Sequence, residues 1–248
     1  MSGMQQMMLG SGKPTSSWKL QGAWASNLQT TDFVDAALPR TPQINEIIVA
    51  VFGYAVDATL GPSNSEITDD TGATGAWIAL TGINANGGFI AASSAGVLRR
   101  IAYKVCTSAG TGGVTVTTWG TPAPTHYLTV GLFSVNSPVG LAALNYQHQG
   151  TLTNWNPPAG NPANPTALTP FVSGPNSLCI LDVWYPNAGT HTQNAQWLTA
   201  WEGPGAPVQP ATDFVGYTTL QQASIVPAVS FGSGACYFVT NCVELHLP

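Results

Sequence analysis

Acidic residues are the first candidates for chemistry in this sequence. The second half of the chain holds four of them, at Asp182, Glu202, Asp213 and Glu244. A glycoside hydrolase needs two carboxylates on opposite sides of a cleft, and no spacing among these four indicates such a pair. Asp69 and Asp70, in EITDDTGATG, could line a calcium loop, but the run lacks the ligand spacing and terminal Glu of an EF-hand. We therefore expect no catalytic carboxylate pair and no bound metal ion.

The other nucleophiles and metal ligands are scattered along the chain. The histidines are His126, His148, His191 and His246, and none stands at metal-ligand spacing from another candidate ligand. The chain has no GxSxG, HExxH or GxxxxGK[ST] motif, so serine-hydrolase, zinc-peptidase and phosphate-loop chemistry have no support. We expect a protein that is not an enzyme and that has no catalytic residue and no cofactor.

The four cysteines, at 106, 179, 236 and 242, show no metal-type CxxC spacing. Cys236 and Cys242 fall in one predicted strand, where six residues span about 20 Å, whereas a disulfide needs Cα atoms within about 7 Å. Buried free thiols in a reducing compartment are therefore expected. The opening MSGMQQMMLG has neither the basic nor the long apolar region of a signal peptide, so we expect assembly in a cytoplasm.

Tryptophans form the second group of candidates. Trp155 begins a Pro-rich loop, and Trp197 and Trp201 precede Glu202. An exposed Trp beside an acid or amide can stack on the C–H face of a sugar while polar groups bind its edge, so these four residues are a candidate glycan or partner contact. The alternative, which we favour, is that the 8 Trp fill cores and interfaces in a charge-poor protein.

The low charge of the chain limits the classes of partner that it can bind. Only 7% of the 248 residues are charged, 11 acidic and 6 basic, and every Lys and Arg lies in the first 104 positions. Binding to nucleic acid needs Lys and Arg to neutralise phosphates, and a membrane span needs about 20 continuous apolar residues. With only 6 basic residues in the chain, we expect no nucleic acid as a partner. Because the best apolar run, Ile47 to Val56, is short and interrupted by Gly53, we expect no membrane as a partner either. The surface is expected to be rich in hydroxyl and amide groups or to lie against another molecule.

The elements that would position these residues are strands. Runs rich in β-branched and aromatic residues predict strands at 44–56, 98–106, 114–119, 126–135, 178–185 and 235–247. Turn signals such as NANGG, NSPVG and GPGAP separate them. Thr31 to Leu38 is the best short helix, because Thr or Asp can cap it and Pro39 follows, while Ala195 to Trp201 is left open between a helical turn and a strand. The prediction is an all-β protein, a β-sandwich or jelly-roll-like fold, with long Gly/Pro/Asn-rich loops at 57–88 and 155–175.

Residues 1–17 are predicted to be an extended N-terminal arm, and residues 18–248 a single β-sandwich domain. The arm holds all 4 Met of the chain and then turns into Gly, Ser and Pro. Flexible apolar side chains fill irregular grooves, so Met4, Met7, Met8 and Leu9 are the expected assembly contacts with a neighbouring chain. A frayed terminus is an equal alternative.

The opening MSGMQQMMLGSG resembles the start of some tailed-bacteriophage virion proteins, including tail-fibre-like proteins. The segments VTVTTWGTPAPTHYLTVGLF and ACYFVTNCVELHLP have the general appearance of virion β-sandwich domains. The resemblance implies a structural component of a virion: a capsid-decorating protein, a head or tail fibre, or another exterior part. It also implies partners, namely further copies of the chain, with a trimer favoured, and other virion proteins. A carbohydrate-reading, lectin-like module that binds a host surface glycan is the alternative.

Overall fold

Every regular element in the described part of the protein is a β-strand, which confirms the all-β prediction. The computed structural model describes residues 18–21, 25–29, 33–57, 66–80, 95–119, 126–135, 145–155, 171–173, 177–185, 191–193, 196–204, 212–219, 222–225, 229–231 and 236–247. Within these residues there is no helix that is long and apolar enough to cross a membrane. The predicted arm, with Met4, Met7, Met8 and Leu9, lies outside them, as does most of the loop at 155–175.

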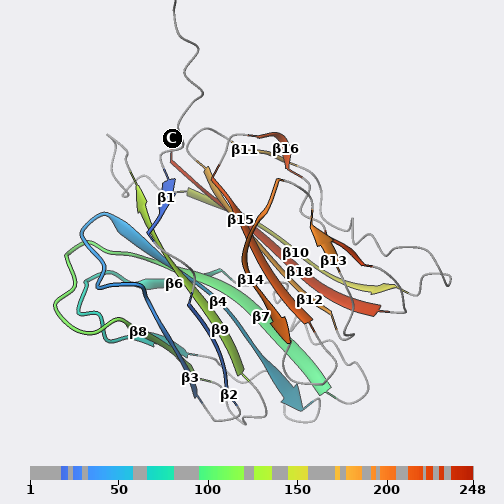
Figure 1. Ribbon diagram of the computed structural model, residues 1–248, viewed down its shortest axis with the longest axis horizontal. Coiled ribbons are helices and arrows are strands. Elements are labelled where there is room, and N and C mark those ends of the chain that lie inside the picture. Colours follow the sequence, from blue (N-terminus) through green and yellow to red (C-terminus); the bar gives the residue numbers. More distant parts are fainter. Residues whose placement is uncertain are drawn as a thin grey trace, which may run out of the picture.

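The strands form three main antiparallel sheets (Figure 1). The central sheet holds β1 (Trp18–Leu20), β2 (Ala25–Gln29), β4 (Glu46–Asp57), β6 (Trp77–Leu80), β7 (Ala95–Val105) and β9 (His126–Val135), in the order β1-β9-β4-β7-β6, with β2 also beside β9. The three-stranded sheet is β3 (Phe33–Ala37), β8 (Thr115–Trp119) and β5 (Glu66–Asp69). The five-stranded sheet is β10 (Asn145–Trp155), β18 (Cys236–His246), β12 (Ser177–Tyr185), β15 (Thr212–Thr218) and β14 (Leu198–Pro204).

Two small ribbons complete the described strands. One pairs β11 (Phe171–Ser173) with β16 (Gln222–Ile225), and the other pairs β13 (His191–Gln193) with β17 (Val229–Phe231). Both ribbons come from the second half of the chain, as does the whole five-stranded sheet. The central and three-stranded sheets come from residues 18–135, and the other sheets come from residues 145–246, so each of these two segments closes its own sheets.

The central sheet is covered on both faces, and β4 shows why. Ile47, Val49 and Val51 share one buried cluster with residues of the five-stranded sheet, whereas the alternate residues of β4 pack toward the three-stranded sheet. The ring of Phe133 on β9 meets that of Tyr217 on β15 edge to face, with centroids 5.9 Å apart. A strand buried on both faces reads as a continuous apolar run rather than an alternating one, and this is the origin of the run beginning at Ile47. The result is a stack of three layers.

The strand predictions at 44–56, 98–106, 114–119, 126–135, 178–185 and 235–247 are confirmed as β4, β7, β8, β9, β12 and β18. Two strands of the five-stranded sheet, β10 and β15, were not predicted. The open stretch at 195–201 becomes a strand from Leu198 onward, as the start of β14.

The predicted helix at Thr31 to Leu38 is wrong, because Phe33–Ala37 is strand β3. Val34, Ala36 and Leu38 are buried while Phe33 and Ala37 are exposed. This is the period-two pattern of a strand that packs one of its faces against a sheet. The capping residues and Pro39 fitted a helix equally well, and the contact of β3 with the central sheet decided the outcome.

Candidate functional site

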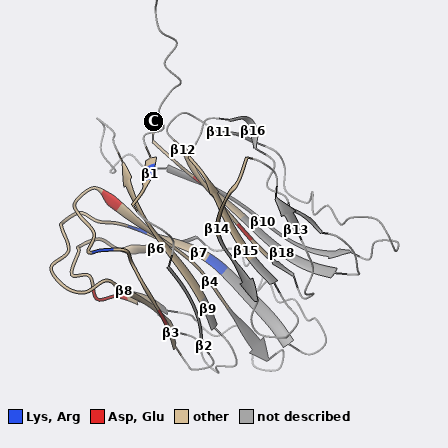
Figure 2. Ribbon diagram, viewed as in Figure 1, with Lys and Arg blue, Asp and Glu red and all other residues tan. Residues whose placement is uncertain are grey.

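Most of the charged side chains that the structure describes are buried or half-buried. Among those that the structure describes, Lys19 and Asp70 are exposed. The buried or half-buried ones are Asp35, Arg40, Glu46, Asp69, Arg100, Lys104, Asp182 and Glu244. Figure 2 shows how little of the described ribbon is charged. Because charged residues are rarely buried unless they are paired, each buried group has to be explained by its partners.

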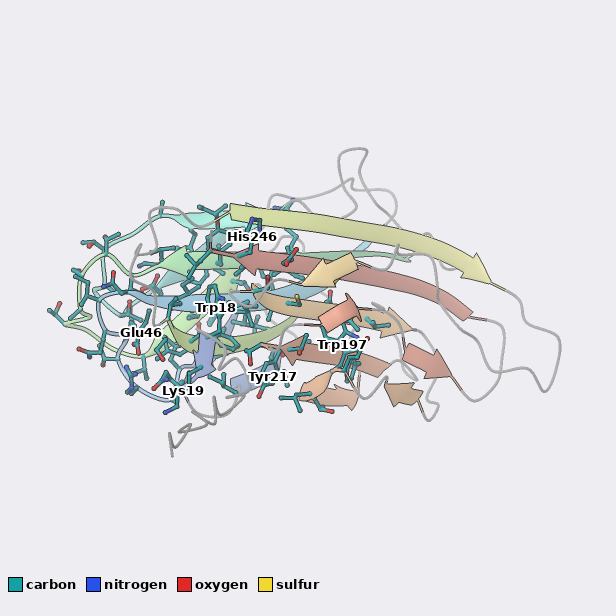
Figure 3. All side chains as sticks on the ribbon, turned by 90° about the horizontal axis from the view of Figure 1, so that it is seen from above. Trp18, Lys19, Glu46, Trp197, Tyr217 and His246 are labelled. Carbon is teal, nitrogen blue, oxygen red and sulfur yellow. The ribbon has the colours of Figure 1, made fainter. Side chains whose placement is uncertain are left out.

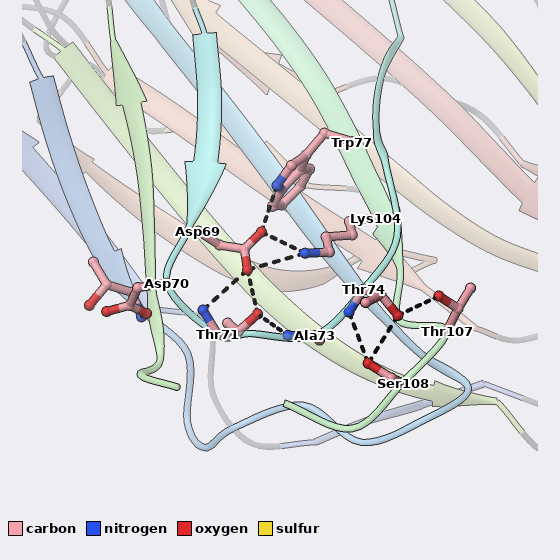
Figure 4. A network of polar contacts seen from close by, with 10 residues as sticks. Asp69, Asp70, Thr71, Ala73, Thr74, Trp77, Lys104, Thr107 and Ser108 are labelled. Atoms are coloured by element: carbon pink, nitrogen blue, oxygen red, sulfur yellow. Dashed lines mark hydrogen bonds and ion pairs between the residues drawn. The ribbon is translucent and has the colours of Figure 1, made fainter. Parts of the chain in front are cut away.

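The most enclosed pair joins the central sheet to the three-stranded sheet (Figure 4). Lys104 on β7 places its Nζ 2.9 Å from Oδ2 and 3.2 Å from Oδ1 of Asp69, at the end of β5. The two side chains are only 7% and 4% exposed. Trp77 on β6 donates its Nε1–H to Oδ2 at 2.8 Å, and Thr71 donates its hydroxyl and its amide to Oδ1. Both carboxylate oxygens therefore have donors, and the ammonium contacts both.

These contacts decide the ionisation of Asp69. Burial on its own raises the pKa of the carboxyl group, because it disfavours the charged form. The hydrogen bonds from Thr71, Lys104 and Trp77, together with the ammonium charge, outweigh burial and lower the pKa of Asp69 below its usual value. Asp69 is thus held as a carboxylate in the resting pair. Cys106 follows Lys104 by two residues and is buried in the cluster toward the three-stranded sheet. Burial raises the pKa of its thiol to about 11.

Backbone hydrogen bonds join two loops at this end of the molecule. The carbonyl of Thr71 accepts the amides of Thr111 and Gly112, both at 2.9 Å, and the carbonyl of Asp70 accepts that of Gly113, also at 2.9 Å. Gly75 has φ +134°, and a Cβ there would lie 2.0 Å from the carbonyl oxygen of Val105. The turn signals TGATG and AGTGG are therefore two halves of one interlocked structure, in which Gly is required for close backbone approach.

A second ion pair lies on the neighbouring loop. Nη1 of Arg40 donates to Oε2 of Glu46 at 2.8 Å, while Nη2 donates to Oε1. The amide of Gln43 also donates to Oε2, at 2.6 Å. The hydrogen bond with Glu46 raises the pKa of Arg40, although partial burial opposes it. Glu46 is 6% exposed at its side chain and Arg40 is 40% exposed, so water reaches this pair from the Arg40 side.

The five-stranded sheet buries a carboxyl group of another kind. Glu244 on β18 accepts a hydrogen bond from the hydroxyl of Ser177 on β12 at 2.6 Å. Cys179 and Cys242 share its sheet face by register, and burial raises the pKa of both thiols, with Glu244 adding to the effect. The Nδ1 of His246 is buried without a hydrogen-bond partner. Three cysteines, Cys106, Cys179 and Cys242, are free and buried as predicted, and Cys236 and Cys242 do share one strand.

The structure does not gather the predicted Trp and Glu residues into one site. Trp155 lies on β10 and Trp201 and Glu202 on β14, and these strands are the opposite edges of the five-stranded sheet. Four strand spacings, about 19 Å, separate them. Trp197 is only 2% exposed and lies against Gly216, within the second-half strands and away from Glu46 (Figure 3). The side chains of Trp155, Trp201 and Glu202 are outside the described set, so the glycan contact stays a prediction that rests on them.

Asp69 and Asp70, considered for calcium, have other partners. Asp69 binds Lys104, and Oδ1 of Asp70 accepts the amide of Thr115 at 2.7 Å. In the described residues no group of three or more His, Cys, Asp or Glu is arranged to hold a metal ion. Sequence reasoning missed the Lys104 partnership, although one signal was present: a single Lys in the apolar strand segment IAYKVC has to find a counter-charge if both faces are buried.

Comparison of the chain with protein-family models, curated proteins and solved structures finds no match.

Proposed function

We propose that this chain is a non-enzymatic structural protein of a bacteriophage virion, such as a capsid-decorating protein or a head or tail fibre, assembled in the host cytoplasm. The observation that carries the proposal is that most of the described charged side chains are buried or half-buried. Exposed charge must be desolvated when subunits associate, at a cost of several kcal/mol for each uncompensated ion. A surface from which most of the described charges are withdrawn is suited to repeated contacts between neutral subunits. Its partners would be further copies, with a trimer favoured, and other virion proteins.

The fold that we propose for this role is a sandwich with an added layer. The shared core of the central and five-stranded sheets supports a β-sandwich, and the three-stranded sheet extends it. The strand order gives the jelly-roll form no support, since residues 18–135 and residues 145–246 each complete their own sheets.

Association and location test the proposal. Light scattering of the purified chain should give a multiple of 25.7 kDa, and immunogold labelling against the chain should decorate particle exteriors. A monomer at micromolar concentration together with unlabelled particles would contradict it.

The arm provides the sharpest variant. Deleting residues 1–12 should leave the melting temperature of the domain nearly unchanged and sharply reduce incorporation into particles. A matched variant with Met4, Met7 and Met8 changed to Ser keeps the arm length and should show the same loss. Normal assembly of both variants would mean that the arm has no role.

One observation favours the glycan-binding alternative. The register of edge strand β14 shifts between Thr199 and Trp201, and a bulge at a sheet edge redirects side chains. Trp201→Ala and Glu202→Gln should then abolish binding on a glycan array, with Trp197→Phe, a change inside the core, as the control that retains it. An array on which the unaltered chain binds nothing would exclude this alternative.

A further inference from the structure

Lys104 and Asp69 are placed as reactants as well as an ion pair. The ammonium nitrogen lies 2.9 and 3.2 Å from the two oxygens of the carboxylate, so it contacts both oxygens of the group. Amide formation would join Nζ to Cγ, the carbon that carries both oxygens, and two groups already held in contact are the starting arrangement that such a reaction needs. Both residues are carried by strands of packed sheets, and the interlocked loops around Thr71 and Gly112 fix the end of β5. We propose that Lys104 and Asp69 condense into an intramolecular amide (isopeptide) bond.

The reaction needs no further reagent. One ammonium proton passes from Nζ to a carboxylate oxygen, which leaves a neutral amine and a neutral carboxyl group. The nitrogen lone pair attacks Cγ of Asp69 to form the C–N bond, and the protonated oxygen leaves with a second proton from nitrogen, which breaks one C–O bond. The products are an amide that keeps one N–H and one molecule of water, with net charge unchanged and no oxidation or reduction.

The surroundings favour the amide in three ways. The side chains are almost excluded from water, and burial penalises two charges more than it penalises a neutral amide. Holding the groups together gives a high effective concentration, on the order of 10⁵–10⁸ M in well-oriented intramolecular reactions. Trp77 and Thr71 donate to the carboxylate oxygens, so they are placed to stabilise negative charge that develops on oxygen as nitrogen adds.

The same contacts make the step slow. Trp77 and Thr71 hold Asp69 as a carboxylate in the resting pair, and among the described residues no third carboxyl group is recorded against the pair to carry protons. The bond should therefore form after folding, as one event in each molecule, and should accumulate as the protein ages. Once formed, it would join the three-stranded sheet to the central sheet through a covalent ring closed between residues 69 and 104.

The Arg40–Glu46 pair is an internal comparison. Its contacts are shorter, but a guanidinium delocalises its nitrogen lone pairs and stays protonated, and Arg40 is 40% exposed. This pair should remain ionic in the same sample in which Lys104 reacts.

Mass spectrometry of the denatured full-length chain tests the proposal. Aged protein should be lighter by one water than freshly folded protein. Trypsin should no longer cleave aged protein after Lys104, while it should still cleave after Arg40. Because Thr41 follows Arg40 and Val105 follows Lys104, both bonds are ordinary trypsin sites. Lys104→Arg should keep full mass at every age. Aged protein at full mass, or a loss that persists in Lys104→Arg, overturns the proposal.

A second variant keeps the test decisive if Lys104→Arg does not fold. Asp69→Asn supplies a carboxamide, and condensation with Lys104 would then release ammonia instead of water, a different mass loss at the same position. Trp77→Phe should slow bond formation in the otherwise unaltered chain, because one donor to the carboxyl oxygen is lost. A loss of one water from Asp69→Asn would place the reaction elsewhere and overturn the assignment.

Discussion

The two faces of the central sheet are stabilised in different ways. On the face toward the five-stranded sheet, β4 contributes Ile47, Val49 and Val51 to a large apolar cluster. On the other face the apolar cluster gives way at one end to Asp69, Lys104 and the interlocked loops. Apolar packing is non-directional and roughly proportional to area, whereas a buried ion pair depends on particular partners. Small changes should therefore be tolerated at the apolar face and costly at the polar end.

The largest effect should come from removing the cation of the polar end. Lys104→Met keeps most of the side-chain volume but leaves Asp69 buried without its counter-charge. Breaking a buried pair in this way costs about 3–5 kcal/mol, measured as a lower free energy of unfolding in urea. Lys19→Met, at an exposed position, is the matched control and should change stability very little. Equal effects of the two variants would show that the ion pair contributes nothing specific.

Acid should weaken the same pair by protonating Asp69. The pKa of Asp69 is lowered in the folded protein, so its stabilisation is fully present above the unfolded-state pKa of about 3.9 and is lost as pH falls through the lower folded-state value. The loss should be smaller than that caused by Lys104→Met. Urea unfolding of freshly folded protein at neutral and acid pH should show a steeper decline for the unaltered chain than for Asp69→Asn. Parallel declines would mean that Asp69 does not titrate differently on folding.

The loops around the pair should be sensitive to a single methyl group. Gly75→Ala puts a Cβ 2.0 Å from the carbonyl oxygen of Val105 in a backbone conformation with φ +134°. Residues forced into such regions cost about 1–3 kcal/mol each. The exposed neighbour Ala76 provides the control, since Ala76→Ser meets no such contact. If thermal unfolding shows Gly75→Ala to be as stable as the control, the loops are less rigid than their hydrogen bonds indicate.

On both faces the sequence predicts strands with strong patterns and misses features that depend on distant partners. Strands with a long apolar or alternating run, such as 126–135, were predicted at their observed bounds. The prediction missed β10, with the polar sequence NYQHQGTLTNW, and β15, with TDFVGYT. Their own composition does not indicate a strand, and their pairing with β18 and β12 makes them strands. The ion pair was missed for the same reason. Asp69 and Lys104 are distant in the sequence, and only the packing of β5 against the central sheet brings them together.

The smallest effect is expected at the apolar face and completes the comparison. Ile180 on β12 is fully buried in the cluster between the central and five-stranded sheets. Ile180→Val removes one methylene from a position where apolar neighbours on both sheets can relax, so it should cost about 0.5–1.5 kcal/mol. Ile44→Val makes the same chemical change at a residue that is 58% exposed, and it should be nearly neutral in the same urea titration. If Ile180→Val instead costs as much as Lys104→Met, the apolar face is as exacting as the polar end, and the distinction between the two faces fails.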